Sequence, residues 1–88
     1  MSDPIRDQIA RTPKQVGDAL RRRRHAQGLN QRALGEKTGL RQATISALEA
    51  GEPGTRLQTL FDAIAALGLE IVIRERTRAS NEKIEDLY

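Results

Sequence analysis

The chain has 88 residues, enough for one small domain, and 38% of them are hydrophobic, which is sufficient for a compact core. The absence of cysteine and the presence of a single histidine exclude a disulfide framework, a thiolate zinc site and a metal site built from several histidines. Fifteen Lys and Arg residues against twelve Asp and Glu residues leave a net charge of +3. No apolar stretch approaches the roughly 18 residues of a membrane span, and the start of the chain lacks the apolar centre of a signal peptide. We therefore expect a cytoplasmic domain with no membrane contact, no cofactor and no catalytic site.

The chain begins with an arm that carries no strong pattern, followed by a clear helix start. Thr12 opens the sequence Thr-Pro-Lys-Gln, which supplies an N-cap, a proline at the first helical position and a glutamine three residues after the cap. Apolar residues then follow at helical spacing, and Gly28 is able to adopt the left-handed conformation that ends a helix. We predict a flexible arm over residues 1–11 and a first helix over residues 13–27.

Two short helices with a tight turn between them come next. Asn30 is suited to cap a helix over residues 31–37, and Gly39 ends it. A third helix is predicted over residues 42–50, closed by Gly51. A short helix, a turn that contains glycine and a second helix are typical of a helix-turn-helix motif.

A fourth helix is predicted from Thr55 or Arg56, and Gly68 ends it. Its apolar residues follow the spacing of one helix face: Leu57, Leu60, Phe61, Ile64 and Leu67. The period then changes to two, which favours a strand over residues 69–75.

No second strand is predicted anywhere in the chain, so this strand would leave its backbone donors and acceptors unpaired. We predict that it pairs with the same strand of a second copy, which makes the chain a homodimer. The helix-turn-helix and dimerisation domain would then span residues 12–76. The residues predicted to dimerise are Leu69, Ile71, Val72 and Ile73.

The surplus positive charge is local. Residues 11–41 hold nine basic and two acidic residues, whereas residues 55–88 hold five basic and six acidic residues. A basic block of this kind indicates either a polyanionic partner or a solvated helix face, and charge alone does not separate the two.

The helix-turn-helix spacing favours a polyanionic partner over a solvated helix face. In this motif the amino end of the second helix enters the major groove of DNA. Gln bonds adenine, Arg bonds guanine and an Ala methyl contacts thymine. We expect base reading by Arg41, Gln42, Ala43 and Ser46. We expect contacts to the DNA backbone from Gln31, Arg32, Thr44 and Arg56.

Residues 77–88 are polar and charged and are predicted to be a flexible tail. The tail nevertheless ends with three apolar or aromatic residues, Ile84, Leu87 and Tyr88. They are either an accidental end or a short anchor that becomes ordered on a partner protein.

The stretch from residue 13 to residue 68 resembles the Xre/Cro family of DNA-binding domains. The matching residues are Leu20, Arg24, Gly28-Leu29-Asn30-Gln31, Leu34, Thr38-Gly39-Leu40, Gln42-Ala43-Thr44-Ile45-Ser46, Glu49, Gly51, Leu57, Leu60 and Leu67-Gly68. The resemblance implies a mainly α, lambda-repressor-like bundle of four or five helices that binds double-stranded operator DNA as a repressor. It also implies an internal ion pair between Arg24 and Glu49.

Within that family, the capping sequence at Thr12, the run from Arg41 to Ser46, the single strand and the tail ending in an aromatic residue resemble the HipB-type antitoxins. This narrower resemblance implies a dimer that binds a palindromic operator in the bacterial cytoplasm, at the nucleoid, and also binds a HipA-type serine/threonine kinase toxin. A free-standing Xre-family regulator and a protein-interaction module without DNA binding remain as alternatives.

Two residues depart from the family pattern. Gly35 stands where the family usually has alanine, and glycine inside a helix costs about 1 kcal/mol, so we expect a weaker second helix. Arg41 stands where a Ser, Thr or Asp often caps the recognition helix, and a lost cap costs roughly 0.5–2 kcal/mol.

Overall fold

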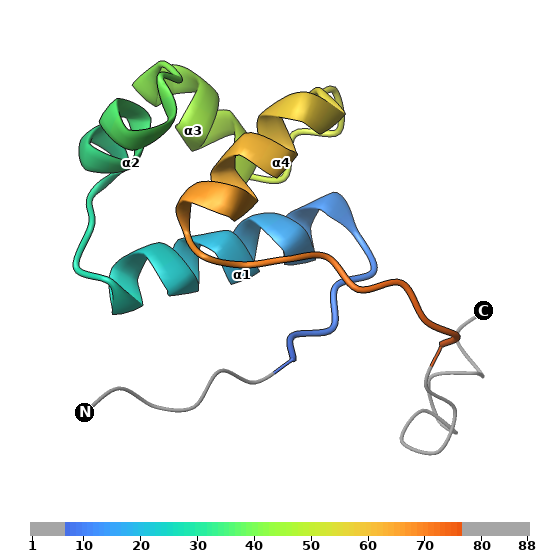
Figure 1. Cartoon of the computed structure of the whole chain (residues 1–88). Coiled ribbons are helices and arrows are strands. Elements are labelled where there is room, and N and C mark those ends of the chain that lie inside the picture. Colours follow the sequence, from blue (N-terminus) through green and yellow to red (C-terminus); the bar gives the residue numbers. More distant parts are fainter. Residues whose placement is uncertain (1–6, 77–88) are drawn as a thin grey trace.

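The computed structural model describes residues 7–76, and these residues form four α-helices around one core (Figure 1). The helices are α1 (Pro13–Ala26), α2 (Gln31–Thr38), α3 (Gln42–Glu49) and α4 (Leu57–Ala66). The mainly α class is confirmed, and each helix begins and ends within two residues of its predicted bounds. The predicted tail residues Ile84, Leu87 and Tyr88 lie outside the described residues, as do residues 1–6 of the arm.

The caps expected for α1 and α2 are present. The hydroxyl of Thr12 accepts a hydrogen bond from the amide of Gln15 at 3.1 Å. The side chain of Asn30 accepts one from the amide of Ala33 at 2.7 Å. Gly39 ends α2 with a φ of 78° and so makes the tight turn into α3. These local bonds satisfy amides that a helix start leaves without a partner.

The helix α3 starts without a side-chain cap. Arg41 occupies the cap position in an extended conformation and makes no capping hydrogen bond. In the sequence Arg41 replaces a capping residue, and the structure confirms that this cap is missing. The short α3 depends on packing rather than on its own start.

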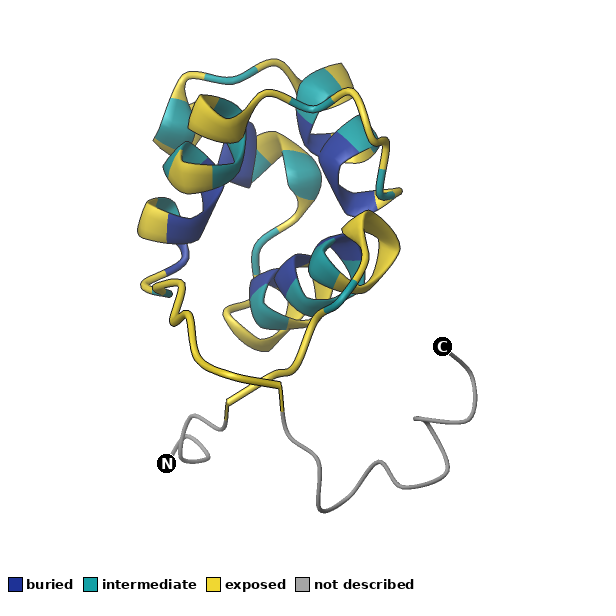
Figure 2. Cartoon of the chain, turned by 90° about the vertical axis from the view of Figure 1, so that its right-hand side faces the viewer, coloured by how far each residue is buried: buried dark blue, intermediate teal, exposed yellow. Residues whose placement is uncertain are grey.

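The core lies where the four helices meet, and their buried positions face one another (Figure 2). Its largest fully buried side chains are Leu34, Ile45 and Leu67, which come from α2, α3 and the end of α4. Burying such a side chain stabilises the fold by roughly 1.5–3 kcal/mol. The remaining core residues are Leu20, Leu48, Ala63 and Ile64.

Gly35 has a different role from the one its helix propensity suggested. It is buried in α2, and a Cβ placed on it would lie 2.7 Å from the carbonyl oxygen of Leu40. The α2–α3 turn therefore comes too close to α2 for an alanine. The expectation that Gly35 weakens the helix stays a prediction, and the structure adds that the residue allows the two elements to pack.

The strand predicted over residues 69–75 is not formed within the part of the chain that the structure describes. A strand requires a paired backbone, and residues 7–76 provide no partner segment. Leu69 still packs against the core. By contrast, Ile71, Val72 and Ile73 are 44%, 66% and 93% exposed. Pairing of this segment across a dimer stays a prediction.

Candidate nucleic-acid interface

Four side chains at the start of α3 form an exposed edge, which we call the reading edge. It consists of Arg41, Gln42, Ala43 and Ser46, all of which are exposed. On the opposite side of the same helix, Ile45 and Leu48 are buried in the core. The helical period therefore separates an anchoring face from a free face, and the residues predicted to read bases all lie on the free one.

A buried ion pair fixes α3 against α1. Arg24 binds the carboxylate of Glu49 through two hydrogen bonds, from Nε at 2.6 Å and from the terminal nitrogen Nη2 at 2.9 Å. Its other terminal nitrogen, Nη1, donates to the carbonyl of Leu29 at 2.8 Å. The two side chains are only 6% and 4% exposed. This is the internal pair that the family resemblance implied, and it assigns Arg24 to the fold rather than to DNA.

The surroundings of Glu49 favour its charged form. Burial alone would raise the pKa of Glu49, but hydrogen bonds from Arg24 and Gln31 and the charges of Arg24 and Arg21 outweigh burial. The pKa of Glu49 is therefore below its ordinary value of 4.5. The hydrogen bond to Glu49 also raises the pKa of Arg24. The pair stays ionised at neutral pH.

The residues predicted to contact the DNA backbone lie in different settings. Gln31 is half-buried, and its Nε2 donates to Glu49 at 3.1 Å, so its amide group is held at the end of α3. Arg32 is exposed and makes an ion pair of 3.7 Å with Glu36. Thr44 is half-buried. Arg56 is exposed at the start of α4 and makes no capping bond.

The arginine run on α1 contains structural contacts that the sequence did not indicate. Arg23 Nε donates to the carbonyl of Leu67 at 3.2 Å, and Gln27 Nε2 donates to the same oxygen at 2.8 Å. Together they satisfy a carbonyl at the carboxyl end of α4. The i, i+4 spacing of Arg23 and Gln27 was the available signal, but their common acceptor, Leu67, lies 44 and 40 residues away along the chain.

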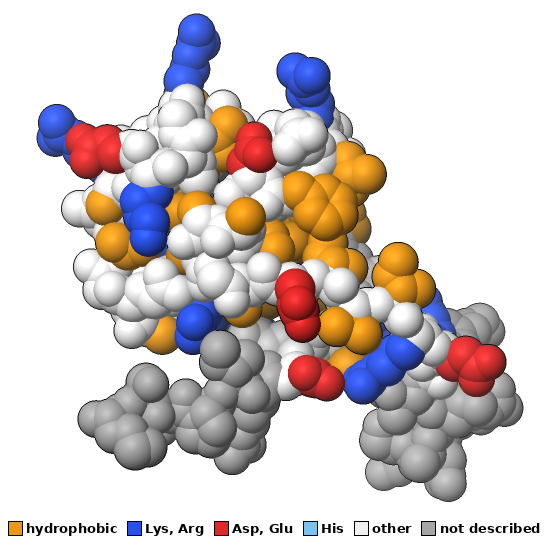
Figure 3. Space-filling model, viewed as in Figure 1, with side chains coloured by type: hydrophobic (Ala, Val, Ile, Leu, Met, Phe, Trp, Pro, Cys, Tyr) orange, Lys and Arg blue, Asp and Glu red, His pale blue; other side chains and the backbone are white. Residues whose placement is uncertain are grey.

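A second surface, which we call the apolar face, lies over α4 and the segment after it (Figure 3). Large hydrophobic side chains gather there, although each is partly or fully in solvent. On α4, Leu57 is 67% exposed and Phe61 is 45% exposed. The apolar face also includes Ile71, Val72 and Ile73. Large hydrophobic side chains exposed on one side of a molecule are typical of an interaction surface.

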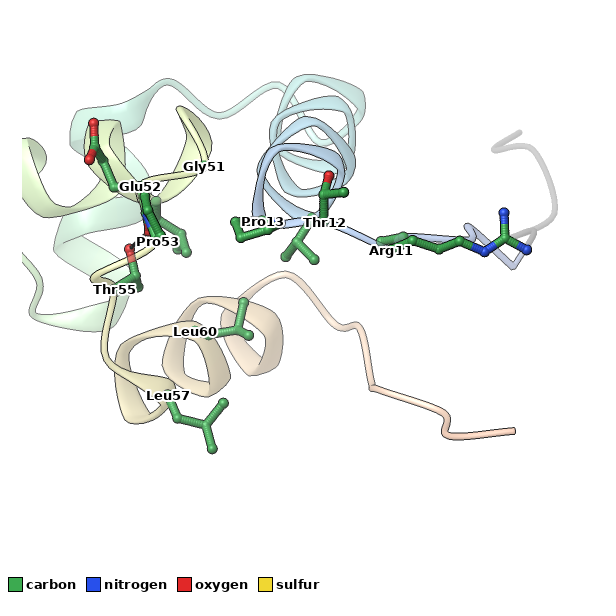
Figure 4. A pocket seen from close by; sticks show the side chains of 12 residues that line it. Arg11, Thr12, Pro13, Gly51, Glu52, Pro53, Thr55, Leu57 and Leu60 are labelled. Atoms are coloured by element: carbon green, nitrogen blue, oxygen red, sulfur yellow. Dashed lines mark hydrogen bonds between the residues drawn. The ribbon is translucent and has the colours of Figure 1, made fainter. Parts of the chain in front are cut away.

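A hollow of about 360 Å³ lies between the start of α1, the loop after α3 and the start of α4 (Figure 4). Arg11 and Glu52 are the charged residues that line it, and their side chains point away from one another. The hollow contains none of the reading-edge residues and no paired acid and base. It therefore has no arrangement suited to catalysis.

Within residues 7–76, no three His, Cys, Asp or Glu side chains come close enough to hold a metal ion. None of the four helices described above is long and apolar enough to cross a bilayer.

Comparison with known proteins places the chain in a family. The family model "Helix-turn-helix" matches residues 20–73. Antitoxin HipB from Escherichia coli K12 is 34% identical over 74 residues, which cover 84% of each chain. The uncharacterized HTH-type transcriptional regulator y4dL from Sinorhizobium fredii is 42% identical over 67 residues, which cover 74% of this chain and 33% of that protein.

Solved structures agree with the sequence comparison. The chain superposes on HipB in the structure of a HipA-HipB-O2-O3 complex with a TM-score of 0.75 and 31% identity, covering 81% of this chain and 100% of that one. The chain therefore belongs to the helix-turn-helix family and, within it, to the family of the HipB antitoxins.

Proposed function

We propose that the protein is a dimeric, sequence-specific DNA-binding repressor that acts as the antitoxin of a HipBA-type toxin–antitoxin system. The observation that carries this proposal is the reading edge, which is exposed on a helix whose opposite face and carboxyl end are fixed in the fold. The relatives add the biological setting, because HipB is an antitoxin and has been solved together with HipA and the operators O2 and O3.

The reading edge has the chemistry needed for the major groove. The amide of Gln42 pairs with an adenine edge, the guanidinium of Arg41 pairs with guanine, and the methyl of Ala43 contacts thymine. Ser46 lies one turn after Gln42 on the same face and both donates and accepts. Gln31, Arg32, Thr44 and Arg56 would contact phosphates and set the orientation of α3.

The apolar face supports a homodimer. Ile71, Val72 and Ile73 are exposed, and Leu57 and Phe61 on α4 belong to the same apolar face. Pairing residues 69–75 with the same residues of a second copy satisfies the backbone and covers the side chains. A two-fold dimer places two α3 helices at a fixed separation, so the operator would be a palindrome with half-sites about 34 Å apart or a multiple of that distance.

The predicted second partner is a HipA-type serine/threonine kinase. The tail residues Ile84, Leu87 and Tyr88 are proposed to bind it, because a short apolar anchor in a polar tail suits a pocket on another protein. Binding through residues 77–88 leaves the reading edge free for the operator. Both partners would be met in the bacterial cytoplasm, at the nucleoid.

The antitoxin role is tested by copurification from the native host with full-length protein and with protein lacking residues 77–88. We expect full-length protein to retain a kinase and its own upstream DNA, and we expect the truncated protein to retain the DNA while losing most of the kinase. Equal recovery of the kinase by both forms would show that residues 77–88 do not bind the kinase. Recovery of no kinase by either form would favour a free-standing regulator.

A free-standing regulator is the second candidate, and one comparison favours it. The regulator y4dL is more similar in sequence over the matched residues than HipB is, and it is about three times longer than the matched part. The same bundle therefore also occurs in a protein of different overall construction. A kinase reading frame next to the gene would support the antitoxin role instead.

A further inference from the structure

One arginine of α1 is not used by the fold. Arg22, Arg23 and Arg24 each donate hydrogen bonds within the described part of the chain, to Gln8, Leu67 and Glu49 respectively. Arg21 is exposed and makes no hydrogen bond or ion pair with any residue from 7 to 76. Its cation is free for a partner, which separates it from its three neighbours.

The helical spacing of α1 places Arg21 beside the carboxyl end of α3. A Cβ on Gly17 would lie 2.7 Å from the carbonyl oxygen of Leu48, and Arg24 binds the carboxylate of Glu49. Arg21 follows Gly17 by four residues and precedes Arg24 by three, so the three share one side of the helix. The charge of Arg21 reaches Glu49, since it is one of the causes that lower the pKa of that carboxyl group.

The last residue of the reading edge, Ser46, lies about one helical turn before Glu49. Gln42, Ser46 and Glu49 follow one another at four- and three-residue spacing along one side of α3. Gln31 is held at Glu49 through its 3.1 Å hydrogen bond. Arg21 and Gln31 therefore both lie near Glu49, about one turn beyond the last residue of the reading edge. The carboxylate between them is buried and already neutralised by Arg24.

We propose that Arg21 binds a backbone phosphate of the duplex read by α3, next to the phosphate contact proposed for Gln31. This inference rests on the proposed function and assigns a positioning residue to it. The guanidinium of Arg21 offers planar, paired donors, which suit the oxygens of a phosphate. Because every duplex has the same phosphates, Arg21 would strengthen binding to all sequences and would not choose among bases.

The matched control is Arg22, the adjacent exposed arginine, whose hydrogen bond leads to Gln8 in the arm. Arg21→Gln and Arg22→Gln remove the same charge from the same helix. Binding of each full-length variant is measured by fluorescence anisotropy across a salt series. The probes are the duplex enriched from a random pool by the wild-type protein and a random-sequence duplex of equal length. Thermal unfolding of each variant shows that it remains folded.

We expect Arg21→Gln to weaken binding several-fold on both duplexes, and to reduce the slope of log Kobs against log salt by about 0.9, the value for one phosphate contact. Arg22→Gln keeps the wild-type slope, and Arg21→Lys keeps most of it. The proposal is overturned if Arg21→Gln keeps the wild-type slope, or if both Gln variants lose the same amount. If the wild-type protein itself binds neither duplex, the proposed function fails and the assignment of Arg21 fails with it.

Discussion

In the proposed function, Gln42 is the residue on which sequence-specific reading depends most. It is exposed at the first position of α3, and its amide donates and accepts at the same time, as the major-groove edge of adenine requires. We expect Gln42→Ala to weaken binding to the wild-type protein's enriched duplex by roughly 1–3 kcal/mol. The same variant should bind random-sequence DNA as the wild type does, because the phosphate contacts remain. Equal losses on both duplexes, measured by anisotropy, would show that Gln42 does not read bases.

Glu49 stabilises the position of α3 by pairing with Arg24 of α1. Glu49→Ala leaves the Arg24 guanidinium buried without its counter-ion, and we expect the free energy of unfolding to fall by about 3–5 kcal/mol. Asp18→Asn removes the exposed Lys14–Asp18 pair and serves as the control, with an expected change of about 0.5 kcal/mol or less. Urea denaturation measures both. A loss for Glu49→Ala as small as that for Asp18→Asn would contradict a structural role for the pair.

The same residue gives the fold a defined acid sensitivity. The pKa of Glu49 in the folded chain lies below its ordinary value of 4.5, so the unfolded chain takes up the proton first as the pH falls. The stabilisation is therefore fully present above about pH 4.5 and is lost as the pH falls through the folded pKa. We expect urea denaturation to show this loss in the wild type. In Arg24→Met/Glu49→Leu, which removes the pair without leaving a charge, the loss should be smaller; an unchanged acid profile would assign the loss to other groups.

At the residue scale, spacing identified the exposed side chains of α3 but not the hydrogen bonds that join the helices to one another. Periodicity separates Ser46 from the buried Ile45 and Leu48, and Gln42 is exposed because it stands at the first position of α3. The bond from Gln31 to Glu49 spans 18 residues, and those from Arg23 and Gln27 to Leu67 span 44 and 40. Contacts of that range depend on how the helices pack, which no local pattern contains.

At the scale of elements, the helices were predictable because local residues mark where they end, and for α1 and α2 also where they begin. Thr12 and Asn30 cap their helices, while Gly28 and Gly39 end them with positive φ. Residues 69–75 are different, because they form no strand in the part of the chain that the structure describes. Their apolar alternation was visible in the sequence, whereas the predicted pairing would need a second copy, which one chain does not contain.

Gly35 gives a test of the α2–α3 packing. We expect Gly35→Ala to lower the free energy of unfolding by roughly 1 kcal/mol, because crowding against the Leu40 carbonyl costs more than the helix propensity gained. Gly54→Ala is the matched control: a Cβ there meets nothing within 4 Å, so stability should rise by about 0.4–1 kcal/mol. Thermal denaturation that finds Gly35→Ala more stable than the wild type would show that the turn has room for a methyl group.

Residues 69–75 give a test of the dimer. We expect Ile71→Lys to convert dimers to monomers at concentrations where the wild type is dimeric, because an ammonium group in the paired apolar segment is desolvated. Affinity for a palindromic duplex should fall with it. Ala26→Lys adds the same charge at the exposed end of α1 and should remain dimeric. If light scattering reports a dimer for Ile71→Lys as well, the copies associate elsewhere.

At the scale of the whole molecule, the proposed function gives the two surfaces separate tasks that depend on each other. A single reading edge would be too short to bind tightly alone, because four side chains can contact only a few base pairs. The proposed dimer would join two reading edges through the apolar face and so double the contacts while fixing their spacing. The arginines of α1 divide accordingly: Arg23 and Arg24 bond other parts of the bundle, Arg22 bonds Gln8 in the arm, and Arg21 is the one proposed to bind the duplex.

The most direct test of this account is the sequence that the protein selects from a random duplex pool, compared with the sequence selected by Gln42→Ala. We expect the wild type to enrich an inverted repeat whose half-sites are about 34 Å apart or a multiple of that distance. We expect Gln42→Ala to lose base preference at one position in each half-site while the symmetry is kept. Enrichment of no sequence by the wild type, or of the same sequence with the same preference by both proteins, would contradict the claim that the exposed edge of α3 reads DNA in a two-fold dimer.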